Sequence, residues 1–257
     1  HGGTILKTAR SEAFVSPGGF QVAVKNLRDY EIDALIVIGG NGSMAGAIKL
    51  SEAGIPTMTI PATIDNDMFG TDYAIGFDTA LNTVVDAVNK IRDTAASHER
   101  VALVQVMGRS SGHIAMMSGL AAGAEVVIIP EQPWTIEELC NQLNESYARG
   151  RLYSLVMLAE GVGNGFTLAD EISSRTGFKP HVTVLGYIQR GGSPSAKDNI
   201  MATRMGSMAV DALVDGRINM MAAELNGEIK MIPYEQAIND ERGIDLSIYD
   251  LIRSLAK

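Results

Sequence analysis

Two acidic side chains stand close together in the stretch Pro61-Ala62-Thr63-Ile64-Asp65-Asn66-Asp67. In an extended segment, residues two apart point the same way, so Asp65 and Asp67 would face one site. One carboxylate could then take a proton from a substrate hydroxyl, while the other helps to organise a metal ion or a water molecule. A turn stabilised by Asx side chains gives the same string of residues and is its commoner origin, so both interpretations stay open at this point.

A glycine-rich stretch, Gly39-Gly40-Asn41-Gly42-Ser43, follows a short apolar run and precedes a helical pattern that begins near Met44. Glycines let a backbone approach a phosphate closely, and a helix start offers N–H groups and a favourable dipole. The alternative is a tight strand-to-helix turn with Ser43 as the N-cap. The stretch is neither a Walker A loop nor a G-x-G-x-x-G dinucleotide fingerprint.

Two arginines lie beside glycines where apolar runs end, in Met107-Gly108-Arg109-Ser110-Ser111-Gly112 and in Gln189-Arg190-Gly191-Gly192-Ser193-Pro194. The guanidinium fork matches phosphate oxygens, so each arginine is suited to clamp a phosphate, although a solvated loop arginine is the commoner case. Glu160 ends another apolar run. Its carboxylate could accept hydrogen bonds from sugar hydroxyls or could merely cap a loop.

The elements that must position these loops follow from short apolar runs, which are near-continuous rather than alternating, as in parallel strands covered on both faces. They predict strands at 34–40, 56–62, 101–108, 124–130, 153–161 and 181–187. A period near 3.6 predicts helices between them, most clearly at 77–91 and more weakly at 20–27, 135–149 and 202–213. Asn226-Gly227 between two short apolar stretches indicates a hairpin within 221–234. This alternation predicts an α/β fold, in which ligands bind at the carboxyl ends of the strands.

The composition excludes several classes of protein. The chain has 257 residues, of which 46% are hydrophobic and 20% charged, and its formal net charge of −9 disfavours binding to nucleic acid. Cys140 is the only cysteine, which excludes a disulfide framework and a cysteine-based zinc site. No apolar run approaches the roughly 18–20 residues that span a bilayer. A soluble cytosolic enzyme is therefore expected, without a membrane or nucleic-acid partner.

Taken in order, five motifs resemble the 6-phosphofructokinase family, and the resemblance runs from Gly2 to about Leu213. The motifs are G-G-N-G-S, P-A-T-I-D-N-D, G-T-D-Y-A-I-G-F-D-T-A, V-M-G-R and L-G-Y-I-Q-R-G-G-S-P. The resemblance implies two similar three-layer α/β domains with mostly parallel sheets. Residues 1–76 and 189–257 would form the larger, nucleotide-binding domain, and residues 77–188 the smaller, sugar-phosphate-binding domain.

The family resemblance also implies an activity. Members transfer the γ-phosphate of ATP to the 1-hydroxyl of fructose 6-phosphate, with Mg²⁺, in glycolysis. A cytoplasmic homotetramer is therefore expected, with ADP or phosphoenolpyruvate as possible effectors. Members that use pyrophosphate carry Asp where this chain has Gly42 and Lys where it has Ala62, so these two residues point to ATP.

By matching motifs, the resemblance implies that Asp65 accepts the hydroxyl proton and that Thr63 contacts the transferring phosphoryl group. Asp67 would support the metal and the substrate, and Arg109 would stabilise the developing charge. The sugar phosphate would be bound by Thr63, Asp65, Met107, Gly108, Arg109, Glu160, His181, Tyr187, Arg190 and, from a neighbouring subunit, Arg100. The nucleotide would contact Arg10, Ser11, Gly40, Asn41, Gly42 and Ser43, with Asn41 and Asp67 at the metal. The effector pocket would contain Arg92, Gly123, Glu125, Arg149 and Arg151.

Three residues depart from the family pattern: Asn41 replaces a metal-binding carboxylate, His181 replaces an arginine, and Tyr187 replaces a histidine. The chain opens at His1, and the family's first strand and a G-G-D-x-P-G nucleotide loop are expected before it. Without them the chain as given is expected to be inactive. Two hypotheses follow: an ATP-dependent phosphofructokinase, or a catalytically weak or regulatory paralogue that binds sugar phosphate.

Overall fold

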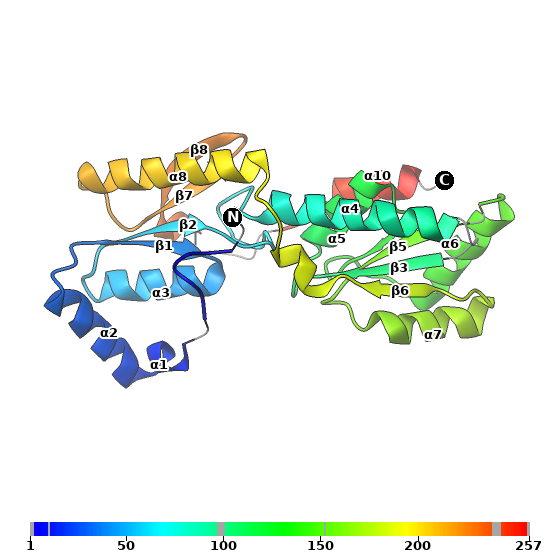
Figure 1. The fold of residues 1–257 in the computed structure, drawn as a ribbon, viewed down its shortest axis with the longest axis horizontal. Coiled ribbons are helices and arrows are strands. Elements are labelled where there is room, and N and C mark those ends of the chain that lie inside the picture. Colours follow the sequence, from blue (N-terminus) through cyan, green and yellow to red (C-terminus); the bar gives the residue numbers. More distant parts are fainter. Residues whose placement is uncertain (1–2, 10, 97–100, 152, 238–242, 256–257) are drawn as a thin grey trace. The chain divides into compact units, whose positions relative to one another are not determined.

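The computed structural model describes residues 3–9, 11–96, 101–151, 153–237 and 243–255, and Figure 1 shows the elements along the chain. The chain divides into two compact units. Unit 1 comprises His1–Thr63, Asp67–Gly76 and Pro194–Arg242, and unit 2 comprises Ile64–Asn66, Phe77–Ser193 and Gly243–Lys257. Each unit contains one four-stranded sheet within the described residues.

Unit 1 is a three-layer α/β unit. Its strands are β1 (Leu35–Gly39), β2 (Thr57–Pro61), β7 (Met220–Leu225) and β8 (Glu228–Pro233), in the order β1-β2-β7-β8. Strands β1, β2 and β7 are parallel, and β8 returns antiparallel through Asn226 and Gly227, both at positive φ, which confirms the predicted hairpin. The helices are α1 (Glu12–Val15), α2 (Pro17–Asp29), α3 (Asn41–Glu52), α8 (Ala196–Val214) and α9 (Tyr234–Ala237).

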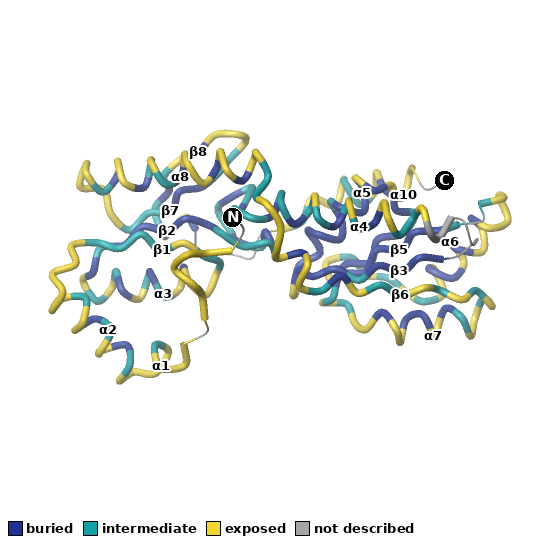
Figure 2. The backbone as a smooth tube through the Cα atoms, in the orientation of Figure 1, coloured by how far each residue is buried: buried dark blue, intermediate teal, exposed yellow. Residues whose placement is uncertain are grey.

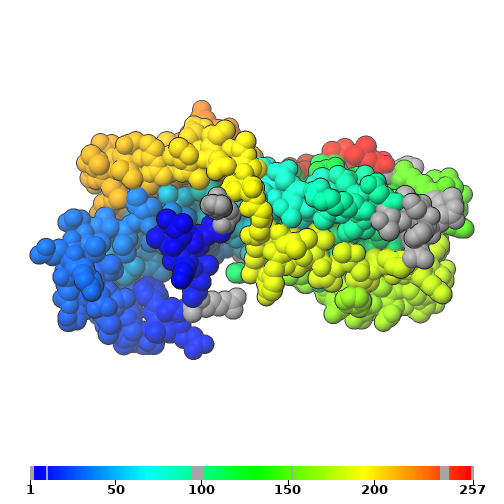
Figure 3. Space-filling view, in the orientation of Figure 1, coloured from blue at the N-terminus to red at the C-terminus, as the bar shows by residue number. Residues whose placement is uncertain are grey.

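The layers of unit 1 follow from its apolar faces. Helix α8 buries Met201 and Met205 against Met58 and Ile60 of β2, and its outer side forms the surface drawn in yellow to orange in Figure 3. Helix α3 covers the other face with Met44. Strand β2 is buried throughout, whereas β1 is half-buried, with Ile38 56% exposed, as expected at a sheet edge.

Unit 2 is also three-layered, and its sheet is wholly parallel in the order β4-β5-β3-β6. Its strands are β3 (Val101–Val106), β4 (Val126–Ile128), β5 (Ser154–Ala159) and β6 (His181–Val184). Its helices are α4 (Phe77–Ala96), α5 (His113–Ala122), α6 (Ile136–Ala148), α7 (Gly165–Thr176), the 3-10 turn η1 (Gly186–Arg190) and α10 (Leu246–Leu255). The central strands β3 and β5 are the dark, buried segments of Figure 2.

Packing explains the two faces of the unit 2 sheet. Helices α6 and α7 place Leu139, Leu143, Leu168 and Ile172 against strand residues such as Leu103. Helices α4, α5 and α10 lie on the opposite face. Helix α6 begins with a capping box in which Thr135 and Glu138 satisfy each other's backbone N–H groups. The predicted α/β class, with two similar layered units and mostly parallel sheets, is confirmed.

Two sequence-based expectations need correction. The N-cap of α3 is Gly40 rather than Ser43, because the helix starts earlier than its apolar pattern. The predicted larger domain included all of residues 189–257, whereas Gly243–Lys257 clusters with unit 2 because α10 packs against α5 and β4. Which unit binds nucleotide and which binds sugar remains a prediction. In the described part of the chain, no helix is long and apolar enough to cross a membrane.

Candidate active site

A carboxylate and an arginine form an ion pair in unit 2. Asp65 is only 6% exposed, and its Oδ2 lies 3.4 Å from Nε of Arg109. The Arg109 side chain is 63% exposed, so most of the guanidinium faces solvent. A buried acceptor beside a largely exposed cation suits a site that receives a hydroxyl proton and stabilises a nearby anion.

The loop that carries Arg109 has an unusual backbone. Gly108 has a φ of 137° and Arg109 a φ of 53°. Residues other than glycine rarely adopt a positive φ. A Cβ on Gly108 would lie 2.4 Å from the carbonyl oxygen of Ser111, so only glycine fits there. The N–H of Ser111 donates to the carbonyl of Gly108 at 2.9 Å and closes the turn.

Glu160 holds this loop from the neighbouring strand. Its Oε1 accepts hydrogen bonds from the N–H of Gly108 at 3.2 Å and from the N–H of Arg109 at 2.9 Å. Glu160 follows β5 directly, and β5 pairs in parallel with β3, so both loops leave the same edge of the sheet. Gly161 allows the close approach, because a Cβ there would lie 2.2 Å from the carbonyl oxygen of Arg109.

The turn η1 supplies the other predicted sugar-side residues. Gln189 is buried, and its Oε1 accepts a hydrogen bond from the N–H of Met107 at 3.1 Å. Arg190 is exposed, and its guanidinium carbon lies 5.1 Å from the ring centroid of Tyr187, a cation–π contact. Tyr187 is 78% exposed. Met107, Gly108, Arg109, Asp65 and Glu160 therefore form one connected group, with Arg190 on the turn that Gln189 anchors to it.

His181 is not brought to this group within the chain. It pairs with Ala102 at the beginning of β3, whereas Gly108 and Arg109 follow the end of that strand. The separation from Ala102 to Val106 is four residues, roughly 13 Å along a strand. Arg100, also predicted at the sugar phosphate, lies outside the described residues.

In unit 1, the predicted nucleotide loop forms the start of α3. Gly40 is the N-cap, and no side chain of the described residues caps the helix there. Asn41, Gly42 and Ser43 are exposed. The first N–H groups of a helix are suited to hold phosphate oxygens, so this terminus can bind an anion.

Thr63 lies beside this helix start. A Cβ on Gly40 would be 3.4 Å from the Cβ of Thr63, and the N–H of Ala62 donates to the carbonyl of Gly39 at 3.0 Å. Asp67 is half-buried in the same unit. Ser11 is exposed and caps α1, accepting a hydrogen bond from the N–H of Phe14, while Arg10 lies outside the described residues.

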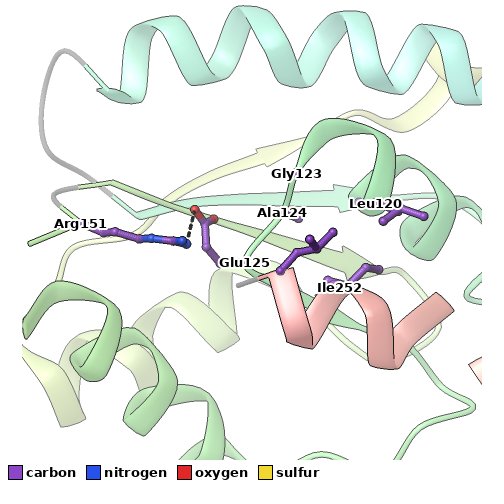
Figure 4. Close-up of a pocket in the computed structure, with 8 residues that line it drawn as sticks. Leu120, Gly123, Ala124, Glu125, Arg151 and Ile252 are labelled. Carbon is purple, nitrogen blue, oxygen red and sulfur yellow. Dashed lines mark ion pairs between the residues drawn. The ribbon is translucent and has the colours of Figure 1, made fainter. Parts of the chain in front are cut away.

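Of the residues predicted to bind an effector, Gly123, Glu125 and Arg151 line a small cavity of about 80 Å³ in unit 2. Figure 4 shows Arg151 pointing toward Glu125, with Gly123, Leu120 and Ile252 of α10 along the lining. Arg151 Nη1 lies 3.8 Å from Glu125 Oε1, and the N–H of Leu155 donates to Glu125 Oε2 at 2.6 Å.

The surroundings of Glu125 in this cavity favour its neutral form more than bulk water does. Burial raises the pKa of Glu125 above its ordinary value, while the Leu155 hydrogen bond and the positive charges of Arg151 and Arg92 act against that rise. A Cβ on Gly123 would lie 4.0 Å from Nη2 of Arg92. Arg149 is exposed and pairs with Glu145 at 3.9 Å.

The structure contains two three-layer α/β units. In its described residues, one unit has a helix start that no side chain caps, and the other has an Asp–Arg ion pair beside the end of a strand. These features belong to an α/β protein that is suited to phosphoryl chemistry. The model of the family described as Phosphofructokinase matches residues 1–213. The chain belongs to the phosphofructokinase family.

Relatives agree with this assignment. Over 255 residues, the chain is 51% identical to the ATP-dependent 6-phosphofructokinase of Brevibacillus brevis and 47% identical to that of Halalkalibacterium halodurans. Each match covers 99% of this chain and 80% of the relative. The phosphofructokinase of Pichia pastoris in the T-state is similar in structure, with a TM-score of 0.87 and 31% identity over 99% of this chain and 31% of that one.

A more distant solved structure shares the fold alone. It is the pyrophosphate-dependent phosphofructokinase of Marinobacter aquaeolei, with a TM-score of 0.85 and 23% identity over 95% of this chain and 68% of that chain. Both kinds of phosphoryl donor are thus named among proteins of this fold. The fold therefore does not decide the donor, and the residues at the loops must.

Sequence reasoning missed two residues that shape the site. Gln189 lies within the L-G-Y-I-Q-R-G-G-S-P motif, but its role was not predicted. Its hydrogen bond to the N–H of Met107 depends on the 3-10 turn η1, whereas the apolar pattern predicts a strand up to residue 187. Glu131 accepts from the N–H of Gly112 through both carboxylate oxygens, at 2.8 and 3.1 Å. It follows β4, so the rule that functional loops leave the carboxyl ends of parallel strands could have drawn attention to it.

Proposed function

We propose that this protein transfers the γ-phosphate of ATP to the 1-hydroxyl of fructose 6-phosphate, giving fructose 1,6-bisphosphate and ADP as a step of glycolysis. The observation that carries the proposal is the buried Asp65 beside the exposed Arg109, on a chain 51% identical to a curated ATP-dependent 6-phosphofructokinase. Transfer of labelled γ-phosphate from ATP to the sugar, followed by mass spectrometry of the product, tests it. Label that appears only in inorganic phosphate would contradict it.

In this mechanism Asp65 acts as the base. The 1-hydroxyl oxygen attacks the γ-phosphorus, its proton passes to the Asp65 carboxylate, and the bond from that phosphorus to the ADP oxygen breaks. Arg109 carries several N–H donors in a planar fork, and its exposure leaves donors directed to solvent that can meet phosphoryl oxygens. Thr63 is proposed to contact the same phosphoryl group.

The sugar phosphate is proposed to bind the loops of unit 2. Met107, Gly108, Glu160 and Arg190 would hold it, with Tyr187 stacked under Arg190. His181 lies beside Ala102 at the beginning of β3, whereas the proposed sugar-binding loop follows the end of that strand. This position argues against a contact between His181 and the sugar phosphate bound by the same chain. We assign it, together with Arg100, to the site of a neighbouring subunit, which requires an oligomer and is consistent with the expected homotetramer.

ATP is proposed to bind at the start of α3. Within the described part of the chain, no heavy atom lies within 4 Å of an ideal Cβ on Gly42, so the position borders open space. A side chain there would project into that space, whereas glycine leaves it to the nucleotide. Together with Ala62, this supports ATP over pyrophosphate as the donor.

The nucleotide is proposed to carry Mg²⁺, which neutralises phosphate charge when bound. The described residues contain no cluster of three or more His, Cys, Asp or Glu that could hold a metal alone. Mg²⁺ commonly uses one or two protein oxygens and completes its shell with phosphates and water, so the oxygen donors of Asp67 and Asn41 fit such a site. Asn41 supplies an amide oxygen in place of a carboxylate and makes the site less negative.

The cavity beside Glu125 and Arg151 is proposed to bind a regulatory anion, ADP or phosphoenolpyruvate. The support is that Glu125, Arg151 and Gly123 line it, and that the positive charge of Arg92 also acts on Glu125. A cytoplasmic location is proposed because glycolysis takes place there. The alternative, a weak or regulatory paralogue, rests on Asn41, His181 and Tyr187, and the curated relatives do not favour it.

A further inference from the structure

We infer that Glu131 is a positioning residue for Arg109, acting through the backbone of the loop between β3 and α5. The inference rests on the proposed function, because it concerns the same phosphoryl-transfer site. Glu131 contacts the backbone of this loop rather than the side chain of Arg109. Its carboxylate binds the N–H of Gly112, at the opposite end of the loop from the Glu160 contacts.

The Gly112 contact is close and specific. Both oxygens of Glu131 accept from the Gly112 N–H, at 2.8 and 3.1 Å, and Gly112 is the N-cap of α5. A Cβ on Gly112 would lie 2.4 Å from the Cβ of Ile129 and 2.7 Å from Glu131 Oε2, so the loop backbone abuts the segment after β4. A carboxylate at a helix N-terminus is also favoured by the helix dipole.

Two carboxylates therefore hold the loop at its two ends. Glu160 binds the N–H groups of Gly108 and Arg109, and Glu131 binds that of Gly112. Between these points the N–H of Ser111 donates to Gly108, and Arg109 stays in the left-handed region at a φ of 53°. A non-glycine residue keeps such a conformation only where its surroundings enforce it.

Loss of the Glu131 contact would release one end of the enforced conformation. Arg109 could then relax toward an ordinary φ, and its Nε would leave the position 3.4 Å from Asp65 Oδ2. Because misplacing a catalytic group by a small distance slows the chemical step more than it weakens binding, the expected loss is in kcat. The KM for ATP should not change, since the proposed ATP loop belongs to unit 1.

The test compares Glu131→Ala, Glu131→Gln and the control Glu171→Ala, all in the complete reading frame. Glu171 is an exposed glutamate on α7 of the same unit. We expect Glu131→Ala to lower kcat about tenfold with an unchanged KM for ATP. Glu131→Gln keeps an oxygen acceptor and should stay within about twofold of the wild type. A Glu131→Ala enzyme with wild-type kcat, or a Gln variant as slow as the Ala variant, would overturn the inference.

A double-mutant cycle separates positioning from general destabilisation. If Glu131 acts through Arg109, Glu131→Ala should cost little further kcat in an Arg109→Ala background, measured by radiolabel transfer for sensitivity. Losses that multiply independently would show that Glu131 acts elsewhere. Wild-type turnover is measured first: its absence contradicts the proposed function, whereas an active wild type with additive losses contradicts only the role of Glu131.

Discussion

Glu160 Oε1 accepts a hydrogen bond from the backbone N–H of Arg109 at 2.9 Å, so a side chain at the end of β5 fixes the main chain at the end of β3. The two strands are paired up to Val106 and Ala159, which brings the residues that follow them into register. The parallel ladder therefore carries the geometry of the site, and the loop conformation of Arg109 depends on a second strand.

This relationship predicts the effect of removing the Glu160 carboxylate. Glu160→Ala should lower kcat/KM for fructose 6-phosphate by roughly 10- to 100-fold, because it leaves two backbone donors without their acceptor and removes a proposed sugar contact. The KM for ATP should remain unchanged. Both constants are measured by steady-state kinetics in which each substrate is varied in turn, with Glu171→Ala as the control. An equal rise in both KM values would show general damage instead.

Asp65→Asn tests the proposed base. The amide cannot take the hydroxyl proton, so turnover should fall by roughly 10²- to 10⁴-fold, while calorimetric binding of fructose 6-phosphate stays close to that of the wild type. The amide has nearly the same shape as the carboxylate, which limits disturbance of the buried position. Loss of binding in proportion to turnover would argue that Asp65 holds the sugar rather than accepting its proton.

Gly42→Asp tests the donor site at the start of α3. The new carboxylate would enter the open space beside the helix and repel phosphates, so the KM for ATP should rise at least about tenfold with the KM for the sugar unchanged. Gly18→Asp is a matched control: no described heavy atom lies within 4 Å of its Cβ position either, and it lies in the first turn of α2. An equal rise in the KM for ATP in the two variants would show that the nucleotide does not bind at this loop.

Asn41→Asp asks whether the unusual amide already serves the metal. If Asn41 supplies an oxygen to Mg²⁺, restoring the carboxylate should change kcat only modestly and lower the Mg²⁺ concentration needed for half-maximal rate. A magnesium titration of turnover for both proteins provides the measurement. A rise in kcat by orders of magnitude would instead support the weak-paralogue hypothesis.

Glu125→Gln should change the pH dependence of stability. Burial raises the pKa of Glu125 above its ordinary 4.5, so the folded state binds its proton more tightly than the unfolded state does. Stability is then lost as the pH rises from about 4.5 through the folded pKa, and the glutamine variant escapes that loss. The variant should unfold at a higher temperature than the wild type at pH 7, with the gap shrinking toward pH 4.5. A difference in unfolding temperature that stays constant across this pH range would exclude the raised pKa of Glu125 as its cause.

The sequence predicted the parts of this fold that depend on local pattern. The apolar runs located β1 to β6, and Asn226-Gly227 located the hairpin, because buried parallel strands and type I′ turns have strong residue preferences. Asp65, Arg109 and Glu160 were also found, since their loops leave the carboxyl ends of strands.

Other features depended on tertiary contacts that no local pattern records. Helix α10 has an amphipathic sequence, but its packing on α5 and β4 is decided by apolar surface in unit 2. The separation of His181 from Arg109 follows from the register of β6 on β3. The hydrogen bond between Glu131 and the N–H of Gly112 follows from the packing of β4 beside α5. Register and loop contact emerge only when the sheet is assembled.

The most direct test of the account is ADP release by the protein expressed from its complete reading frame. Rates are measured as ADP release with Mg²⁺ and ATP, with and without fructose 6-phosphate, and as formation of fructose 1,6-bisphosphate with pyrophosphate in place of ATP. The account predicts sustained turnover only when ATP and fructose 6-phosphate are both present. The absence of turnover with both ATP and pyrophosphate, from a folded protein that still binds fructose 6-phosphate, would contradict it and identify a degenerate paralogue.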